Sequence, residues 1–136
     1  MKILSVDFGE TRTGYAVSDE LMFGATTLEN FKSHSIDAVA MHTIALAKEH
    51  NAQRIVVGFP KNMNGTVGER GEKTLRLKEK IEKLSDYPVV LWDERLTTVS
   101  AHNLMNTTNV RGKKRKESVD SISAAFILQS YLDSLK

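Results

Sequence analysis

Residues 2–18 read KILSVDFGETRTGYAVS, and this stretch decides the fold of the chain. The apolar run over residues 3–8 stops at Gly9 and predicts a buried strand, because short apolar runs bounded by turn residues are typical of strands inside a sheet. Residues 12–18 predict a second strand, joined to the first through a tight turn. With a weaker third strand over residues 23–28, the N-terminal part is predicted to form an antiparallel meander.

Beyond the meander the apolar pattern changes to helical spacing. The first helix is expected to have Ser33 or Ser35 as its N-cap. Thr66 and Glu69 have the spacing of a capping box, which predicts that the second helix begins there. A short helix is predicted around residues 101–105, before the last and longest apolar stripe.

Two more apolar runs, residues 54–59 and 88–92, predict buried strands. Each follows a predicted helix, and a strand reached through a helical crossover pairs in parallel. Asp120 opens the last helix, whose apolar stripe runs from Ser121 to Leu135. The pattern predicts an α/β fold with a five-stranded mixed sheet, three strands antiparallel and two parallel, flanked by helices.

The composition is typical of a single folded domain spanning residues 1–136. The absence of cysteine excludes disulfides, thiolate metal sites and a cysteine nucleophile. No apolar run reaches the ~18 residues of a membrane span, and the run after Lys2 is too short for a signal peptide. The sequence therefore predicts a soluble cytoplasmic protein with no membrane partner.

Acidic residues stand where apolar ones are expected. Asp7 ends the first buried strand, and the pair Asp93 and Glu94 ends the last one. Asp120 continues an apolar face of the last helix. The carboxyl ends of parallel strands meet at one sheet edge, where ligands bind, so we expect these acids to gather there. Each also has a structural interpretation: a turn at Asp7, a pair with Arg95, and a favourable helix dipole at Asp120.

Gathered carboxylates repel one another unless a cation neutralises them. Oxygen ligands without cysteine or a histidine pair favour Mg²⁺ or Mn²⁺ over Zn²⁺. Such a cluster can hold two metal ions and activate water for attack on a phosphodiester. The predicted cofactor is therefore Mg²⁺ or Mn²⁺, with two ions bound.

Four stretches carry a more specific signal: DFGETRTG at residues 7–14, VGFPKNMNGT at 57–66, DERLTT at 93–98 and DSISAAFILQ at 120–129. In this order they resemble the YqgF (RuvX) family of pre-16S ribosomal RNA nucleases, which are related to the RuvC Holliday junction resolvases. The resemblance covers nearly the whole chain and implies an RNase H-like fold. It also implies a catalytic and metal-binding triad of Asp7, Glu94 and Asp120, with Asp93 as the reserve ligand.

Basic and polar residues near these acids are candidates for binding nucleic acid. They are Arg12 after the first turn, Lys61 and Asn62 in the middle loop, Arg95 beside the acidic pair, and Arg111, Lys113, Lys114, Arg115 and Lys116 in a basic loop. Binding of this kind would contact phosphates without reading sequence and would depend strongly on salt. The structural alternatives are an ion pair for Arg12 and a solvated surface for the basic loop.

Two classes of function fit these features. The first is a metal-dependent endonuclease, which the resemblance assigns to the 5′ end of precursor 16S rRNA in ribosome biogenesis, with RNA or ribosomal particles as partners. A variant of this class is a Holliday junction resolvase acting on branched DNA. The second class is a non-catalytic nucleic-acid-binding factor in ribosome assembly or transcription. A monomer and a homodimer are both compatible with the sequence.

Overall fold

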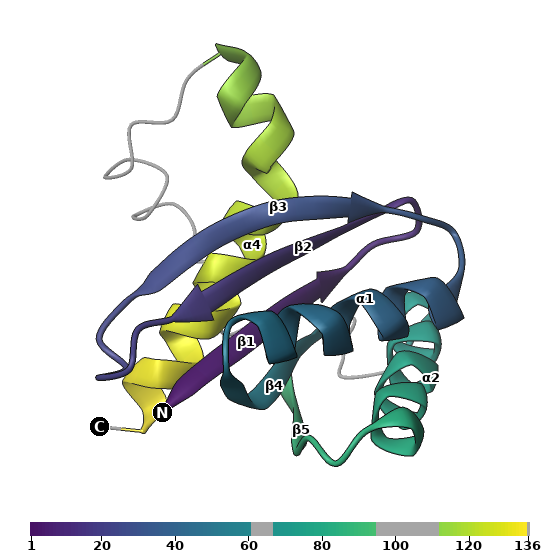
Figure 1. Ribbon diagram of the computed structural model, residues 1–136. Coiled ribbons are helices and arrows are strands. Elements are labelled where there is room, and N and C mark those ends of the chain that lie inside the picture. Colours follow the sequence, from purple (N-terminus) through teal and green to yellow (C-terminus); the bar gives the residue numbers. More distant parts are fainter. Residues whose placement is uncertain (61–66, 95–111, 136) are drawn as a thin grey trace.

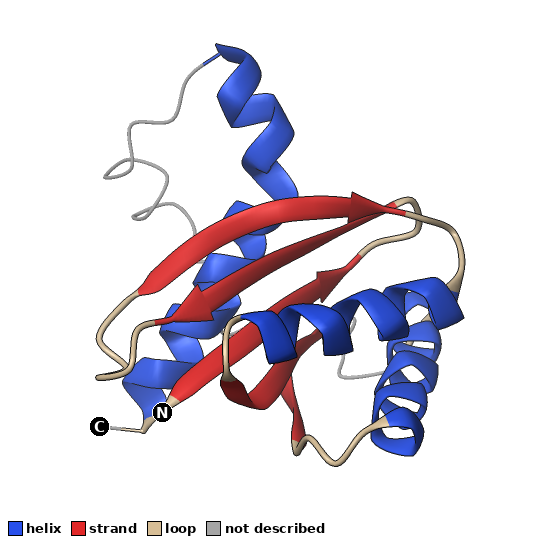
Figure 2. Ribbon diagram, viewed as in Figure 1, coloured by secondary structure: helices blue, strands red, loops and turns tan. Residues whose placement is uncertain are grey.

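The computed structural model describes residues 1–60, 67–94 and 112–135, with the backbone alone over residues 112–120. One five-stranded sheet forms the centre of the fold, and helices cover both of its faces (Figure 1). Helices lie on both faces of the sheet, and the C-terminal helix crosses the face opposite to the others (Figure 2). The predicted α/β layering is confirmed.

The sheet has the order β3-β2-β1-β4-β5. Its antiparallel half contains β1 (Lys2–Phe8), β2 (Arg12–Ser18) and β3 (Ala25–Lys32). Its parallel half adds β4 (Ala52–Phe59) next to β1 and β5 (Val89–Asp93) at the edge. The meander and the two parallel additions agree with the prediction from the sequence.

Two strands differ in detail from the prediction. β3 begins at Ala25 and extends to Lys32, because it pairs with β2 until Lys32 lies opposite Arg12. β5 was predicted to be buried, yet all five of its residues are only half-buried. An edge strand has a partner on one side only, and an apolar run cannot distinguish that position from the sheet centre.

Three helices are described: α1 (Ile36–Glu49), α2 (Glu69–Leu84) and α4 (Gly112–Ser134). Ser35 is the N-cap of α1, and its Oγ accepts a hydrogen bond from the Ala38 N–H at 3.2 Å. The predicted capping box at α2 is wrong, because Gly68 is the N-cap and makes no side-chain cap bond. The short helix predicted around residues 101–105 lies outside the described residues.

The basic run was also predicted wrongly as a loop, since residues 112–116 lie inside the first turns of α4. Lysine and arginine are good helix formers, so a basic run extends a helix easily when the next segment is helical. The candidates Lys113, Lys114, Arg115 and Lys116 are therefore held on a helix that continues through Asp120.

Each face of the sheet has its own apolar core. One core lies under α1 and α2 and includes Leu4, Val6 and Val57, and the other lies under α4 and includes Ile3 and Val56. Side chains alternate between faces along a strand, so odd-numbered residues of β1 face α4. The Ser5 hydroxyl confirms this direction by donating to the Ala124 carbonyl of α4 at 2.6 Å.

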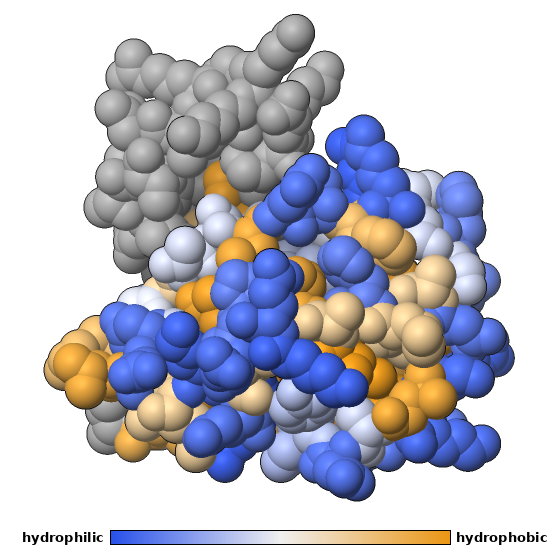
Figure 3. All heavy atoms as spheres, in the orientation of Figure 1, coloured by the Kyte–Doolittle hydropathy of each residue, from blue (hydrophilic) through white to orange (hydrophobic). Residues whose placement is uncertain are grey.

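Polar side chains dominate the face of the molecule seen in Figure 3, with smaller apolar areas between them. Within the described ranges, no helix is long and apolar enough to cross a membrane.

Candidate active site

The carboxyl ends of β1, β4 and β5 bring two of the predicted acids to one edge of the sheet. Val6 is opposite Val57, so Asp7 and Gly58, each one residue further, are neighbours on adjacent strands. Gly58 is in turn opposite Trp92 of β5, and Glu94 follows two residues later. Adjacent strands lie about 4.8 Å apart, which places all three positions within the width of a small site.

Glu94 lies across the face of Gly58. A Cβ atom added to Gly58 would stand 2.8 Å from the Glu94 Oε1 and 3.1 Å from its Cγ, and it would also collide with the Ile127 Cδ1 of α4. Gly58 is buried, and the absence of its side chain leaves the space that the Glu94 carboxylate occupies. A glycine in a strand often marks such a close approach.

Asp93 and Glu94 separate onto opposite faces. Val89 and Leu91 pack against the core under α1 and α2, whereas Val90 and Trp92 pack against the core under α4. By this alternation Asp93 belongs to the α1 and α2 face. Glu94 is the member of the pair on the same face as Asp7.

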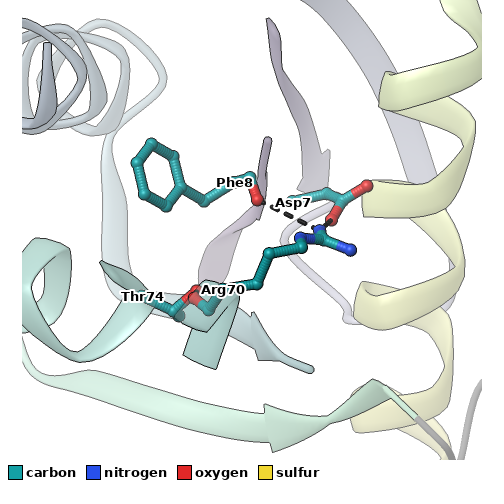
Figure 4. A network of polar contacts seen from close by, with 4 residues as sticks. All are labelled: Asp7, Phe8, Arg70 and Thr74. Carbon is teal, nitrogen blue, oxygen red and sulfur yellow. Dashed lines mark hydrogen bonds and ion pairs between the residues drawn. The ribbon is translucent and has the colours of Figure 1, made fainter. Parts of the chain in front are cut away.

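Asp7 faces α4 and is mostly buried, with 17% of its side chain exposed. Its Oδ1 lies 4.0 Å from the guanidinium of Arg70, which reaches over from the first turn of α2 (Figure 4). The same guanidinium donates to the Phe8 carbonyl at 3.3 Å. Burying a carboxylate without a partner costs several kcal/mol, and Arg70 supplies one of the compensating charges.

Arg70 was missed by the sequence analysis, although a signal for it exists. The N-terminus of a helix carries a partial positive charge, so a cation in the first turn is unfavourable there. Arg70 stands between Glu69 and Glu72 in that turn. A basic residue in this unfavourable position is a signal that its side chain has a partner elsewhere, and here the partner is the end of β1.

The position of Asp120 is fixed through its neighbours in α4. The hydroxyl of Ser121 donates to the Leu28 carbonyl at 2.5 Å and accepts from the Tyr15 N–H at 3.4 Å. Tyr15 is opposite Val6, directly beside the strand position of Asp7. The helix backbone at Asp120 thus begins its passage over the sheet near the end of β1, while its side chain lies outside the described atoms.

The chemistry of the described donors fits a hard divalent cation. Asp7 and Glu94 both offer carboxylate oxygens, the ligands that Mg²⁺ and Mn²⁺ prefer. Among the side chains that the structure describes, no group of three His, Asp or Glu residues lies close enough to hold a metal ion. A complete metal site therefore needs a ligand beyond the described side chains, and Asp120 is the predicted one.

The remaining predicted residues fall into three groups. Arg12 is exposed at the start of β2, on the turn next to the end of β1. Lys113, Lys114, Arg115 and Lys116 lie on the backbone of α4, with side chains outside the described atoms. Lys61, Asn62, Arg95 and Arg111 lie outside the described residues.

Comparison with known proteins adds independent information. A family model described as "RuvX: Holliday junction resolvase" matches residues 1–134. A protein of Acetivibrio thermocellus named "Putative pre-16S rRNA nuclease" is 43% identical over 136 residues, covering 98% of this chain and 96% of its own. A Bacillus subtilis protein of the same name is 43% identical over 137 residues, covering 99% of both chains.

Solved structures of two resolvases share the fold. T. thermophilus RuvC in complex with a Holliday junction substrate has a TM-score of 0.66 at 11% identity, over 100% of this chain and 97% of that chain. The fowlpox virus resolvase bound to Holliday junction DNA has a TM-score of 0.59 at 16% identity, over 99% of both chains. The predicted RNase H-like fold is thereby confirmed.

Proposed function

The chain belongs to the RuvX family, and from this membership we propose that it is a metal-dependent endonuclease that processes the 5′ end of precursor 16S rRNA. The observation that carries the proposal is that Asp7 and Glu94 lie on the same face of the sheet, at the carboxyl ends of β1 and β5. The names of the relatives that are 43% identical supply the substrate.

We assign Asp7, Glu94 and Asp120 as the residues that would hold Mg²⁺ or Mn²⁺, in a site with two ions. When bound, the cation supplies Lewis-acid stabilisation of a phosphodiester and lowers the pKa of bound water. The α4 face favours Glu94 over the reserve ligand Asp93, because the alternation along β5 directs Asp93 to the opposite face.

Arginine and lysine side chains have a role separate from that of the metal ions in this proposal. Arg70 neutralises Asp7 and holds its carboxylate at the sheet edge through the ion pair at 4.0 Å. Arg12 presents a guanidinium near the same edge, where its planar donor fork suits a phosphate. We also assign nucleic-acid binding to Lys61, Asn62, Arg95, Arg111 and the four basic residues of α4.

The biological setting follows from the substrate. We propose one nuclease domain over residues 1–136 that acts in the cytoplasm on RNA, free or within ribosomal particles, as a monomer or homodimer. No membrane partner is included in the proposal.

The test is cleavage of a labelled precursor rRNA fragment with Mn²⁺, Mg²⁺ or EDTA, using the wild type, Asp7→Asn and Glu94→Gln. Both variants are expected to lose cleavage while retaining the wild-type urea unfolding midpoint. Asp86→Asn is the matched control, since Asp86 is exposed in the loop between α2 and β5. Full activity of Asp7→Asn, or of the wild type in EDTA, would refute the proposal.

A second candidate is resolution of branched DNA, favoured by the description of the family as Holliday junction resolvases. Running a four-way junction beside the RNA fragment under the same conditions separates the two substrates. Binding of either substrate without cleavage under any metal would instead identify a non-catalytic nucleic-acid-binding factor.

A further inference from the structure

Two hollows lie beside the β1–β2 turn, near the strand end that carries Asp7. The first, of about 80 Å³, lies between Phe8, His34 and Arg70. The second, of about 340 Å³, is lined by Thr11, Arg12, Lys32, Ser33 and His34. His34 lines both hollows, so the second lies next to the first, whose lining also includes Arg70 and Glu10.

The walls of the second hollow come from two turns that lie side by side at one end of the sheet (Figure 1). The Ser33 N–H donates to the Thr11 carbonyl at 3.0 Å and fastens the β3–α1 connection to the β1–β2 turn. The Ser35 N–H donates to the Ser33 Oγ at 3.0 Å and fixes the start of α1. The hollow is therefore held by bonds between its own walls before any ligand enters.

Two cations face each other in this hollow. Arg12 and Lys32 are opposite residues in the β2–β3 pairing, and both are exposed. Like charges directly opposite on neighbouring strands destabilise a sheet. Within the described part of the chain neither side chain has an ion pair, and the acid at the start of α1, Asp37, is paired with Lys80 at 3.2 Å. Glu10 lines the first hollow, whereas the lining of the second contains two cations and no acid.

From this juxtaposition we propose that the hollow of Arg12, Lys32 and His34 binds backbone phosphates of the nucleic-acid strand next to the cleaved bond. The inference rests on the proposed nuclease function. It gives the path of the nucleic-acid strand, which runs from the Asp7 end of β1 across the β1–β2 turn. Recognition is by charge and leaves the bases unread, because phosphate contacts carry no sequence information. Lys32 and His34 become binding residues that no motif indicated.

The test measures binding without cleavage. Anisotropy of a fluorescein-labelled single-stranded RNA is recorded in EDTA at 50 to 200 mM salt for the wild type and for the double variant Arg12→Gln/Lys32→Gln. Each lost phosphate contact lowers the slope of log affinity against log salt by about 0.7 for a single strand. The slope for the double variant is expected to be shallower by ~1.4. Between 50 and 200 mM salt, the loss of affinity of the double variant is then smaller than the wild-type loss by a factor of about seven.

The matched control is Lys48→Gln, which removes one charge at the opposite end of α1 and is expected to leave the slope unchanged. An unchanged urea midpoint in the double variant shows that the hollow itself is intact. A wild-type slope and affinity in the double variant would overturn the proposal, as would a wild type that binds no strand. Because cleavage is not measured, loss of activity in Asp7→Asn tests the nuclease function separately.

Discussion

Replacing Gly58 by alanine tests the packing that places the Glu94 carboxylate at the candidate site. The added Cβ would stand 2.8 Å from the Glu94 Oε1 and would collide with the Ile127 Cδ1, while ordinary carbon contacts lie at about 3.5–4.0 Å. Ile127 is 2% exposed, so its side chain is enclosed by the core. Both the Ile127 and the Glu94 side chains must shift to admit the added atom.

The expected cost combines two opposing effects. Overpacking of a close-packed core costs about 1–3 kcal/mol. Alanine restricts the unfolded chain more than glycine does, which offsets about 0.4–1 kcal/mol. We therefore expect Gly58→Ala to lower the free energy of unfolding by ~1–2 kcal/mol. Displacement of a site carboxylate by about 1 Å is expected to reduce cleavage by about 100-fold.

The single tryptophan offers a convenient assay. Trp92 is opposite Gly58 in the β4–β5 pairing, and its Nε1 donates to the Ser130 Oγ of α4 at 3.2 Å, so its fluorescence reports on the same interface. Urea unfolding is followed by this signal, and cleavage of the labelled RNA is measured in parallel. Gly24→Ala is the control, because nothing lies within 4 Å of the added Cβ. If Gly58→Ala matches Gly24→Ala in stability and cleavage, Glu94 and Ile127 do not occupy this space. The placement of the Glu94 carboxylate beside Gly58 would then be wrong.

Three further predictions concern the same framework. Arg70→Gln is expected to reduce cleavage several-fold with less than about 1 kcal/mol change in stability, because Arg70 is half exposed yet contacts Asp7. Lys78→Gln, which removes the pair with Glu82 on the same helix, should leave cleavage unchanged and alter stability by less than about 1 kcal/mol. Ser5→Ala removes the bond to the Ala124 carbonyl and should cost about 1 kcal/mol in urea unfolding, and a wild-type midpoint would show that this bond does not hold α4. Burial lowers the pKa of His42 from its ordinary 6.5, although Glu49 and Glu29 oppose the shift. The unfolded chain then binds more protons, so stability should fall as pH drops below ~6.5 and His42→Gln should flatten this slope; parallel wild-type and variant curves would contradict the assignment.

Local patterns were sufficient for most of the fold. The strand–turn–strand pattern of residues 2–18 specified the β1–β2 hairpin, and a weaker apolar run indicated β3. The alternation of helices and strands added the parallel half of the sheet. The predictions that failed concern features that depend on adjacent residues or strands in the folded chain. The predicted capping box at Thr66 failed because Gly68 caps α2, and β5 is half-buried because it has a single partner strand.

For the candidate site, the sequence alone determined which carboxylates end their strands, because a charged residue at the end of an apolar run is visible without any structure. It could not choose between Asp93 and Glu94, since that choice depends on which face of the sheet α4 covers. The charge pattern of α2 marks Arg70 as unusual, but only the tertiary structure shows that its guanidinium meets the Phe8 carbonyl, 62 residues away in the chain. Spacing rules describe neighbours within a turn or a strand, whereas the contacts that build this site form only when separate elements pack.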